Sequence, residues 1–372
     1  MHFLHIVGAR PNFMKAAPVL RALARHANVR QTLVHTGQHY DKGMSDVFFR
    51  ELGMPEPDVN LAVGSGSQAS QTAEVMLRLE PVVVAQRPDC VVVYGDVNST
   101  LAAALVCAKV LIPVAHVEAG LRSRDRTMPE EINRLLTDQV ADWLFTPSAD
   151  ADENLRGEGI ASEKIHRVGN VMIDTLVHLL PQAKLPDQLS DLLKSDLLKN
   201  DHPFILVTLH RPGNVDDLPW LREMLAALAN VSRDTEVIFP VHPRTLSRIA
   251  EAKAAPLASA RLRLLPPLPY LQFLALQRSA RVVITDSGGV QEETSFLGVP
   301  CLTLRENTER PITLTSGTNI LVGRDIARLR RELERTLAQP PRPPSPIPLW
   351  DGHAAERIAD VLTRHTLTLS SL

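Results

Sequence analysis

Residues 282–293 read VVITDSGGVQEE, and this stretch says more about the fold than any other part of the chain. An apolar, β-branched run ends at Asp286, and a helical pattern begins after the glycine pair. The stretch therefore predicts a strand that leads directly into the N-terminus of a helix. Gly288 and Gly289 would let a ligand approach the backbone, and the unpaired N–H groups of the first helical turn favour a phosphate.

The same stretch offers side chains for a nucleotide diphosphate. Ser287 adds a hydroxyl donor beside the glycines, and Glu293, about one turn into the helix, can reach the hydroxyls of a ribose. The loop is neither GxGxxG nor GxxxxGK[ST], so the dinucleotide and P-loop fingerprints do not apply. A tight strand-to-helix turn that binds nothing is the alternative interpretation.

Outward from this stretch, short apolar runs alternate with longer helical patterns along the whole chain. The first series of predicted strands is 4–7, 32–35, 90–94, 114–117, 144–146 and 165–168, and the second is 204–209, 236–241, 262–265, 282–285 and 301–304. Such alternation is typical of βαβ units, so we predict the α/β class with two Rossmann-like, doubly wound domains. In that arrangement a ligand is expected in a crevice between the domains, at the carboxyl ends of both sheets.

Composition excludes several classes of function. The chain has 372 residues, 40 basic against 42 acidic, and a formal charge of -2, so no overall field recruits nucleic acid or an anionic membrane. No apolar run is long enough to span a bilayer. The three cysteines, Cys90, Cys107 and Cys301, lie in apolar stretches without metal-ligand spacing. We expect a soluble cytoplasmic protein with no metal and no cofactor.

Three acidic residues follow strands or begin helices in the first half. Asp96 follows the strand 90–94, Glu118 follows the strand 114–117, and Glu130 comes directly after Pro129, which can open a helix that also carries Arg134. Carboxylates that meet at one sheet edge can hold an acid and a base at the same pH. Each residue taken alone is more often structural, as a helix cap, a first-turn acid or the partner of an arginine.

Basic, imidazole and aromatic candidates also lie next to predicted strands. Arg10 and Lys15 follow the first strand and can converge on an anion, although both can also be solvated. His210 follows the strand 204–209 and is a candidate general acid or base, or a structural histidine. Phe273 can stack on a base or belong to the core, and Arg310 is placed to bind a phosphate.

Taken in order, these motifs resemble the non-hydrolysing UDP-N-acetylglucosamine 2-epimerases over essentially the whole chain. The segments that carry the resemblance are Gly8 to Pro11, Tyr94 to Asp96, His116 to Arg122, Pro129 to Arg134, Gly169 and Asn170, His210 and Arg211, Asp286 to Glu293, Thr308 to Pro311, and Asp351 with Gly352. The resemblance implies a GT-B-like fold with domains 1–170 and 171–352, and a final helix in 353–372 that crosses back to the first domain. It also implies a homodimer.

The resemblance further implies roles for the candidate residues. Phe273 would lie against uracil and Glu293 at the ribose, while Arg10, Arg310 and the Ser287–Gly289 loop would surround the diphosphate. The catalytic set would be Asp96, Glu118, Glu130 and His210, supported by Lys15 and Arg134. The implied reaction inverts C2 of UDP-N-acetylglucosamine by eliminating UDP to a 2-acetamidoglucal and adding it back.

Two departures from the family pattern leave the sugar and its regulation open. Pro212 and Gly213 stand where many members have polar residues, and the loop 37–43 lacks parts of a second substrate site, so we expect a hyperbolic rate curve. The alternatives are a 2-epimerase of a modified UDP-sugar and a GT-B glycosyltransferase that uses a UDP-sugar. A hydrolysing 2-epimerase and a non-catalytic UDP-sugar sensor are more distant alternatives.

Overall fold

The two halves of the chain form separate α/β units. The computed structural model describes residues 1–38, 49, 51–186, 189, 203–252, 261–340 and 346–369, with side chains up to residue 364. The first unit is Met1–His178 with Pro348–Leu372, and the second is Leu179–Ile347. Each unit contains one parallel sheet with helices in the connections, which confirms the predicted fold class.

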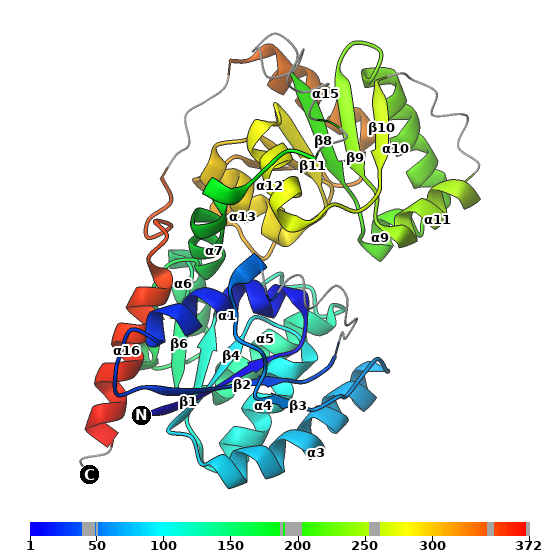
Figure 1. The fold of residues 1–372 in the computed structure, drawn as a ribbon. Coiled ribbons are helices and arrows are strands. Elements are labelled where there is room, and N and C mark those ends of the chain that lie inside the picture. The colour runs from blue at the N-terminus through cyan, green and yellow to red at the C-terminus, as the bar shows by residue number, and fades with distance from the viewer. Residues whose placement is uncertain are drawn as a thin grey trace. The chain divides into compact units, whose positions relative to one another are not determined.

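The sheet of the first unit has seven strands in the order β3-β2-β1-β4-β5-β6-β7 (Figure 1). Its strands are β1 (His2–Val7), β2 (Arg30–His35), β3 (Val59–Asn60), β4 (Cys90–Tyr94), β5 (Val114–Val117), β6 (Trp143–Thr146) and β7 (Ile165–Arg167). All six strands predicted for this half are present. The additional edge strand, β3, has only two residues, which is too short to leave a periodic signal.

Helices cover both faces of this sheet, as right-handed crossovers require. They are α1 (Arg10–Leu23), α3 (Gln68–Gln86), α4 (Asn98–Lys109), α5 (Pro129–Val140), α6 (Ala149–Gly157), α7 (Val171–Leu179) and α16 (Ala354–Leu369). The final helix, α16, packs beside α1 within the first unit, as expected from the family resemblance (Figure 1). Its first turn is capped by Asp174, whose carboxylate accepts the N–H groups of Ala354 and Ala355.

The sheet of the second unit has six strands in the order β10-β9-β8-β11-β12-β13. The strands are β8 (Phe204–Thr208), β9 (Glu236–Pro240), β10 (Leu262–Leu265), β11 (Val282–Thr285), β12 (Cys301–Thr303) and β13 (Asn319–Leu321). The helices are α9 (Pro212–Val215), α10 (Leu218–Val231), α11 (Pro243–Glu251), α12 (Tyr270–Ser279), α13 (Gly288–Leu297), α14 (Ile312–Thr315) and α15 (Ile326–Ala338). The strand β13 was not predicted from the sequence.

The strand orders fix where chemistry is expected in each unit. In doubly wound sheets, ligands bind beyond the carboxyl ends of strands where the strand order reverses. That reversal lies between β1 and β4 in the first unit and between β8 and β11 in the second. In the described part of the chain, no helix is long and apolar enough to cross a membrane.

Candidate active site

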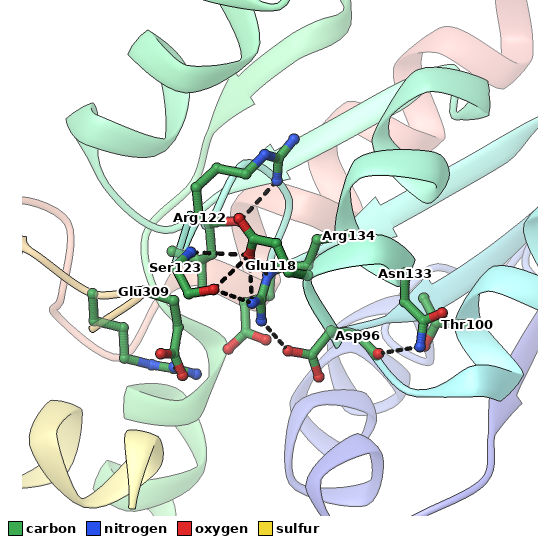
Figure 2. Close-up of polar contacts among 12 residues, drawn as sticks. Asp96, Thr100, Glu118, Arg122, Ser123, Asn133, Arg134 and Glu309 are labelled. Atoms are coloured by element: carbon green, nitrogen blue, oxygen red, sulfur yellow. Dashed lines mark hydrogen bonds and ion pairs between the residues drawn. The ribbon is translucent and has the colours of Figure 1, made fainter. Parts of the chain in front are cut away.

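At the switch point of the first unit, Asp96 is held by a buried arginine. The Arg134 Nη1 donates to the Asp96 carboxylate at 2.5 Å, and Arg134 Nη2 donates to Glu131 at 2.6 Å (Figure 2). The Glu131 carboxylate also accepts the N–H groups of Ser123 and Arg124. Burial disfavours ionisation of Glu131, but these N–H groups and Arg134 outweigh it and lower its pKa. Arg134 is therefore fixed as a cation that orients Asp96.

A second buried pair lies against the same turn. The Lys15 ammonium, from α1, forms an ion pair with Glu118, which follows β5, and both side chains are buried. Glu118 has φ 74, a left-handed conformation that costs about 1–3 kcal/mol for a residue other than glycine. A Cβ on Gly95 would lie 2.5 Å from Lys15 Nζ, so glycine at this position leaves room for the ion pair.

Two of the predicted acids share a cavity. Asp96 and Glu130 line a cavity of about 280 Å³ together with Asn98 and Asn133. The N-termini of α4 and α5 open onto it, because Asn98 and Pro129 are the first residues of those helices. About a quarter of the Asp96 side chain remains exposed despite its bond to Arg134. The cavity therefore offers two carboxylates to a bound molecule.

In the second unit, His210 lies beside a buried aspartate. Asp286 is fully buried, and its carboxylate lies 3.1 Å from His210 Nδ1. It also accepts the N–H groups of His210 and Arg211 and an N–H from the Asn214 side chain. Burial disfavours the charged form of Asp286, but His210 and these donors outweigh it and lower the pKa of Asp286. The imidazole of His210 is about half exposed, with Nδ1 turned towards the protein.

The predicted phosphate loop follows β11 and begins α13. Ser287 is the N-cap, and among the described residues its side chain makes no capping hydrogen bond, so the first-turn N–H groups are available to a ligand. Arg310 lies against this turn, since a Cβ on Gly288 would come within 2.7 Å of Arg310 Nη1. Arg310 is paired with Glu292 at 2.7 Å and with Glu309. Burial opposes ionisation of Glu309, but Arg310 and Arg305 hold its pKa well below the usual range.

The predicted ribose and base ligands are close neighbours in the same unit. Glu293 is buried and accepts a hydrogen bond from the Tyr270 hydroxyl at 2.8 Å. Phe273 is half-buried, three residues after Tyr270 in α12, and packs against a core cluster. The Tyr270–Glu293 hydrogen bond joins α12 to α13, the helix that begins at the predicted phosphate loop.

The structure places the sequence candidates in two groups, one in each unit. The first group is Arg10, Lys15, Asp96, Glu118, Glu130 and Arg134, and the second is His210, Phe273, Ser287, Gly288, Gly289, Glu293 and Arg310. Arg10 is exposed at the first turn of α1, whereas Lys15 is buried and bound to Glu118. Of the 37–43 loop, for which the sequence predicted an incomplete second substrate site, residues 39–43 lie outside the described residues, while Gln38 lines the same cavity as Asp96.

Three carboxylates that hold these groups in place were not predicted. Asp286, Glu131 and Glu309 each stand next to a candidate in the sequence, and each is buried against an arginine or a histidine. Their position directly beside a predicted site residue is the only signal that the sequence offers for them. Burial and pairing become visible only in the folded chain.

Comparisons with known proteins identify the family of the chain. Residues 21–363 match the family described as UDP-N-acetylglucosamine 2-epimerase. The chain is similar to the UDP-N-acetylglucosamine 2-epimerase of Methanocaldococcus jannaschii, with 41% identity over 96% of this chain and 98% of that protein. It is also similar to the UDP-2,3-diacetamido-2,3-dideoxy-D-glucuronate 2-epimerase of Pseudomonas aeruginosa, with 39% identity over 98% and 100% of the two chains.

A solved structure supports the same assignment. The Methanocaldococcus jannaschii enzyme, crystallised in complex with UDP-GlcNAc and UDP, superposes with a TM-score of 0.87 at 41% identity, covering 98% of this chain and 100% of that chain. The similarity therefore extends over both units and includes the predicted fold.

Proposed function

The chain belongs to the UDP-N-acetylglucosamine 2-epimerase family, and we propose that it inverts C2 of UDP-N-acetylglucosamine by eliminating UDP and adding it back. The observation that carries this proposal is the composition of the two switch points. The first unit offers carboxylates on a cavity, and the second offers a helix N-terminus with Arg310 and an aspartate-bound histidine. Proton transfer and diphosphate departure need these two kinds of group.

The chemistry explains why both kinds are required. The hydrogen on C2 is not adjacent to a carbonyl, so a base cannot remove it without another bond breaking. When the base takes the C2 proton, the electron pair of the C2–H bond forms a C1–C2 double bond. At the same time the C1–O bond breaks, and its electron pair leaves with UDP. The 2-acetamidoglucal is then protonated at C2 on the opposite face, and UDP adds at C1. Guanidinium and helix N–H groups stabilise the charge on the departing diphosphate.

We assign the proton transfers to Asp96, Glu118, Glu130 and His210. Asp96 and Glu130 are supported by their place on the cavity wall, and His210 by its exposed ring. Glu118 adjoins the turn that precedes Asp96, where Lys15 balances its charge. Nucleotide binding falls to Arg10, Phe273, Glu293, Arg310 and the Ser287–Gly289 loop.

The test uses purified protein, UDP-N-acetylglucosamine and heavy water, followed by NMR. Epimerisation predicts deuterium at C2, a manno product and almost no free UDP. Asp96→Asn and His210→Asn should abolish the exchange while UDP still binds, and the exposed Asp360→Asn in α16 serves as the control. Accumulation of free UDP with free N-acetylmannosamine would instead indicate a hydrolase. Transfer with C2 still protonated would indicate a glycosyltransferase.

A modified UDP-sugar is the second candidate substrate. The relative that acts on UDP-2,3-diacetamido-2,3-dideoxy-D-glucuronate is 39% identical, against 41% for the UDP-N-acetylglucosamine enzyme, so overall identity does not separate the two. Comparison of kcat/KM for the two sugars decides between them. A ratio that favours the diacetamido glucuronate would replace the substrate proposed above.

We also propose a cytoplasmic homodimer. Five large apolar side chains of the first unit are exposed, and they lie on or next to α3, α4, α5 and α7: Leu77, Val84, Leu111, Leu136 and Val177. Buried free cysteines fit a reducing compartment. Light scattering should give twice the chain mass of 41.0 kDa. Leu77→Lys should shift the mass to one chain, whereas Leu246→Lys in the second unit should not.

A further inference from the structure

His116, in β5, is completely buried and has a hydrogen-bond partner at each ring nitrogen. Its Nδ1 lies 2.6 Å from an Asp138 carboxylate oxygen, and its Nε2 lies 2.8 Å from the Gly95 carbonyl oxygen. Asp138 belongs to α5, and Gly95 directly follows β4. The ring therefore joins two strands and a helix at the switch point of the first unit.

The two partners fix the orientation of this ring. A carbonyl oxygen can only accept, so Nε2 carries a hydrogen. The other Asp138 oxygen already accepts the Gly120 N–H at 3.1 Å and pairs with Arg122 Nη2 at 2.8 Å. These contacts hold the Asp138 carboxyl in place, so the ring of His116 is held from both sides.

The charged groups next to the ring are paired with one another. Asp138 faces the ring from α5, Arg122 pairs with the same carboxylate, and Glu158 pairs with Arg122 at 2.6 Å. The Lys15–Glu118 pair on the same strand ends is neutral as a pair.

The consequence concerns the turn that carries Asp96. Gly95 adopts φ +63 and presents its carbonyl to His116. From the next residue, the Asp96 carbonyl accepts Asn133 Nδ2 at 2.8 Å, and its carboxylate accepts Arg134. Asn133, Arg134 and Asp138 all lie on α5, the helix that begins with Glu130 in its first turn.

We propose that His116 is a positioning residue: its buried ring fastens the Gly95–Asp96 turn to α5, so that Asp96 and Glu130 keep their spacing on the cavity. The inference rests on the roles proposed above for these two acids. It adds a residue that acts on the reaction through hydrogen bonds rather than by contact with the sugar.

The ring hydrogen bonds are tested first, on the unmodified protein. Proton-detected NMR with nitrogen-15 in the histidine rings should show an Nε2–H signal of His116 that exchanges slowly with solvent, because this group is buried and donates to the Gly95 carbonyl. Loss of this signal in His116→Asn assigns it. His5 is the internal comparison, since it is equally buried but has Tyr94 OH at 2.7 Å from Nδ1. A His116 ring with its hydrogen on Nδ1 alone would overturn the proposal.

The positioning role is tested with matched variants. His116→Asn and Asp138→Asn should lower kcat about a hundredfold while the Kd of UDP stays unchanged, because small displacements of reacting groups have effects of this size. His5→Asn changes a buried histidine of β1, which β4 separates from β5. This variant should keep its kcat when the rate is corrected for the folded fraction. An activity loss in His116→Asn no greater than in His5→Asn would refute the role. If the unmodified protein does not epimerise, the proposed function fails, whereas the NMR result stands by itself.

Discussion

Replacing Asp286 with asparagine should disable His210 by changing which ring nitrogen carries the hydrogen. One Asp286 oxygen faces Arg211 N–H at 2.9 Å and Asn214 Nδ2 at 3.1 Å, and both of these groups can only donate. The other oxygen faces His210 Nδ1 at 3.1 Å and shares the His210 backbone N–H with the first oxygen, at 3.2 Å to each. The new amide nitrogen therefore takes the place of this second oxygen, and the backbone N–H keeps its bond to the first. There it donates to Nδ1, and the hydrogen moves to Nε2. A neutral ring of this tautomer cannot accept a proton at its exposed nitrogen.

The magnitude follows from the loss of one proton-transfer group. General acid–base catalysis contributes about 10²–10⁴ in rate, so we expect kcat to fall about a thousandfold in Asp286→Asn. The exchange of a charged for a neutral acceptor should also lower stability by about 1–3 kcal/mol. The binding of UDP should change much less than kcat, because the α13 turn remains in place.

The assay combines deuterium incorporation at C2 with nitrogen-15 NMR of the His210 ring. The matched control is Asn214→Ala, which removes a buried donor to Asp286 and to the Leu304 carbonyl but leaves the carboxylate facing the ring. It should lower stability and keep the Nδ1–H tautomer and most of kcat. Unchanged turnover in Asp286→Asn, or the same tautomer in both variants, would refute the reasoning.

Three further perturbations test other parts of the structure. Burial outweighs two backbone hydrogen bonds and raises the pKa of Asp174 from 3.8 to about 6, so its contribution to folding is complete below pH 3.8 and is lost as the pH rises through 6. The free energy of unfolding of Asp174→Asn, measured against that of the unmodified protein in denaturant curves, should therefore be about 3 kcal/mol more favourable to the variant at pH 8 than at pH 4. Gly288→Ala places a Cβ 2.7 Å from Arg310 Nη1 and should weaken UDP binding about tenfold in calorimetry. Tyr270→Phe removes the 2.8 Å hydrogen bond to Glu293 and should weaken the binding of UDP about fivefold. The binding of 2′-deoxy-UDP should be weakened much less.

Each of these perturbations has a control in the chain. Gly213 has open space around its Cα, so Gly213→Ala should leave UDP binding unchanged. The exposed Asp360→Asn in α16 makes the same chemical change outside the core and is the control for Asp174→Asn. If Tyr270→Phe weakened the binding of UDP and of 2′-deoxy-UDP equally, Glu293 would not be the ligand of the ribose 2′-hydroxyl. A stability gain for Asp174→Asn that is larger at pH 4 than at pH 8 would contradict the burial argument.

The fold was predictable because its central strands are buried on both faces. Strands such as β4 and β11 are fully buried and therefore read as continuous apolar runs, which sequence patterns detect well. β3 and β13 have two and three residues and lie at sheet edges, where partial exposure leaves no such run. The strand ends were predictable too, so the sequence could place Asp96 and Glu118 next to one another on the sheet edge.

The pairing of charges was not predictable, because neighbouring acids look alike in the sequence. Glu130 and Glu131 both fall within one turn of Arg134, and periodicity alone allows either pairing. The structure pairs Arg134 with Glu131, since the N–H groups of Ser123 and Arg124 already hold that carboxylate. Glu130 therefore lines the cavity.

Lys15 was expected to lie with Arg10 at a bound anion. In the structure it forms an ion pair with Glu118, a carboxylate of its own chain.

The charge balance at the α13 turn bears on why the reaction can run in both directions. Arg211, Arg305 and Arg310 lie close enough to interact, and Glu309 pairs with the last two. Glu292 pairs with Arg310 as well. The arginines are thus held in fixed positions before a diphosphate arrives, so little reorganisation opposes the growth of charge on the leaving group. The same glutamates offset most of the positive charge, which keeps UDP from being bound so tightly that its return to C1 becomes slow. Removing Glu309 should therefore tighten UDP while lowering turnover, which is the opposite of what a purely structural carboxylate would do.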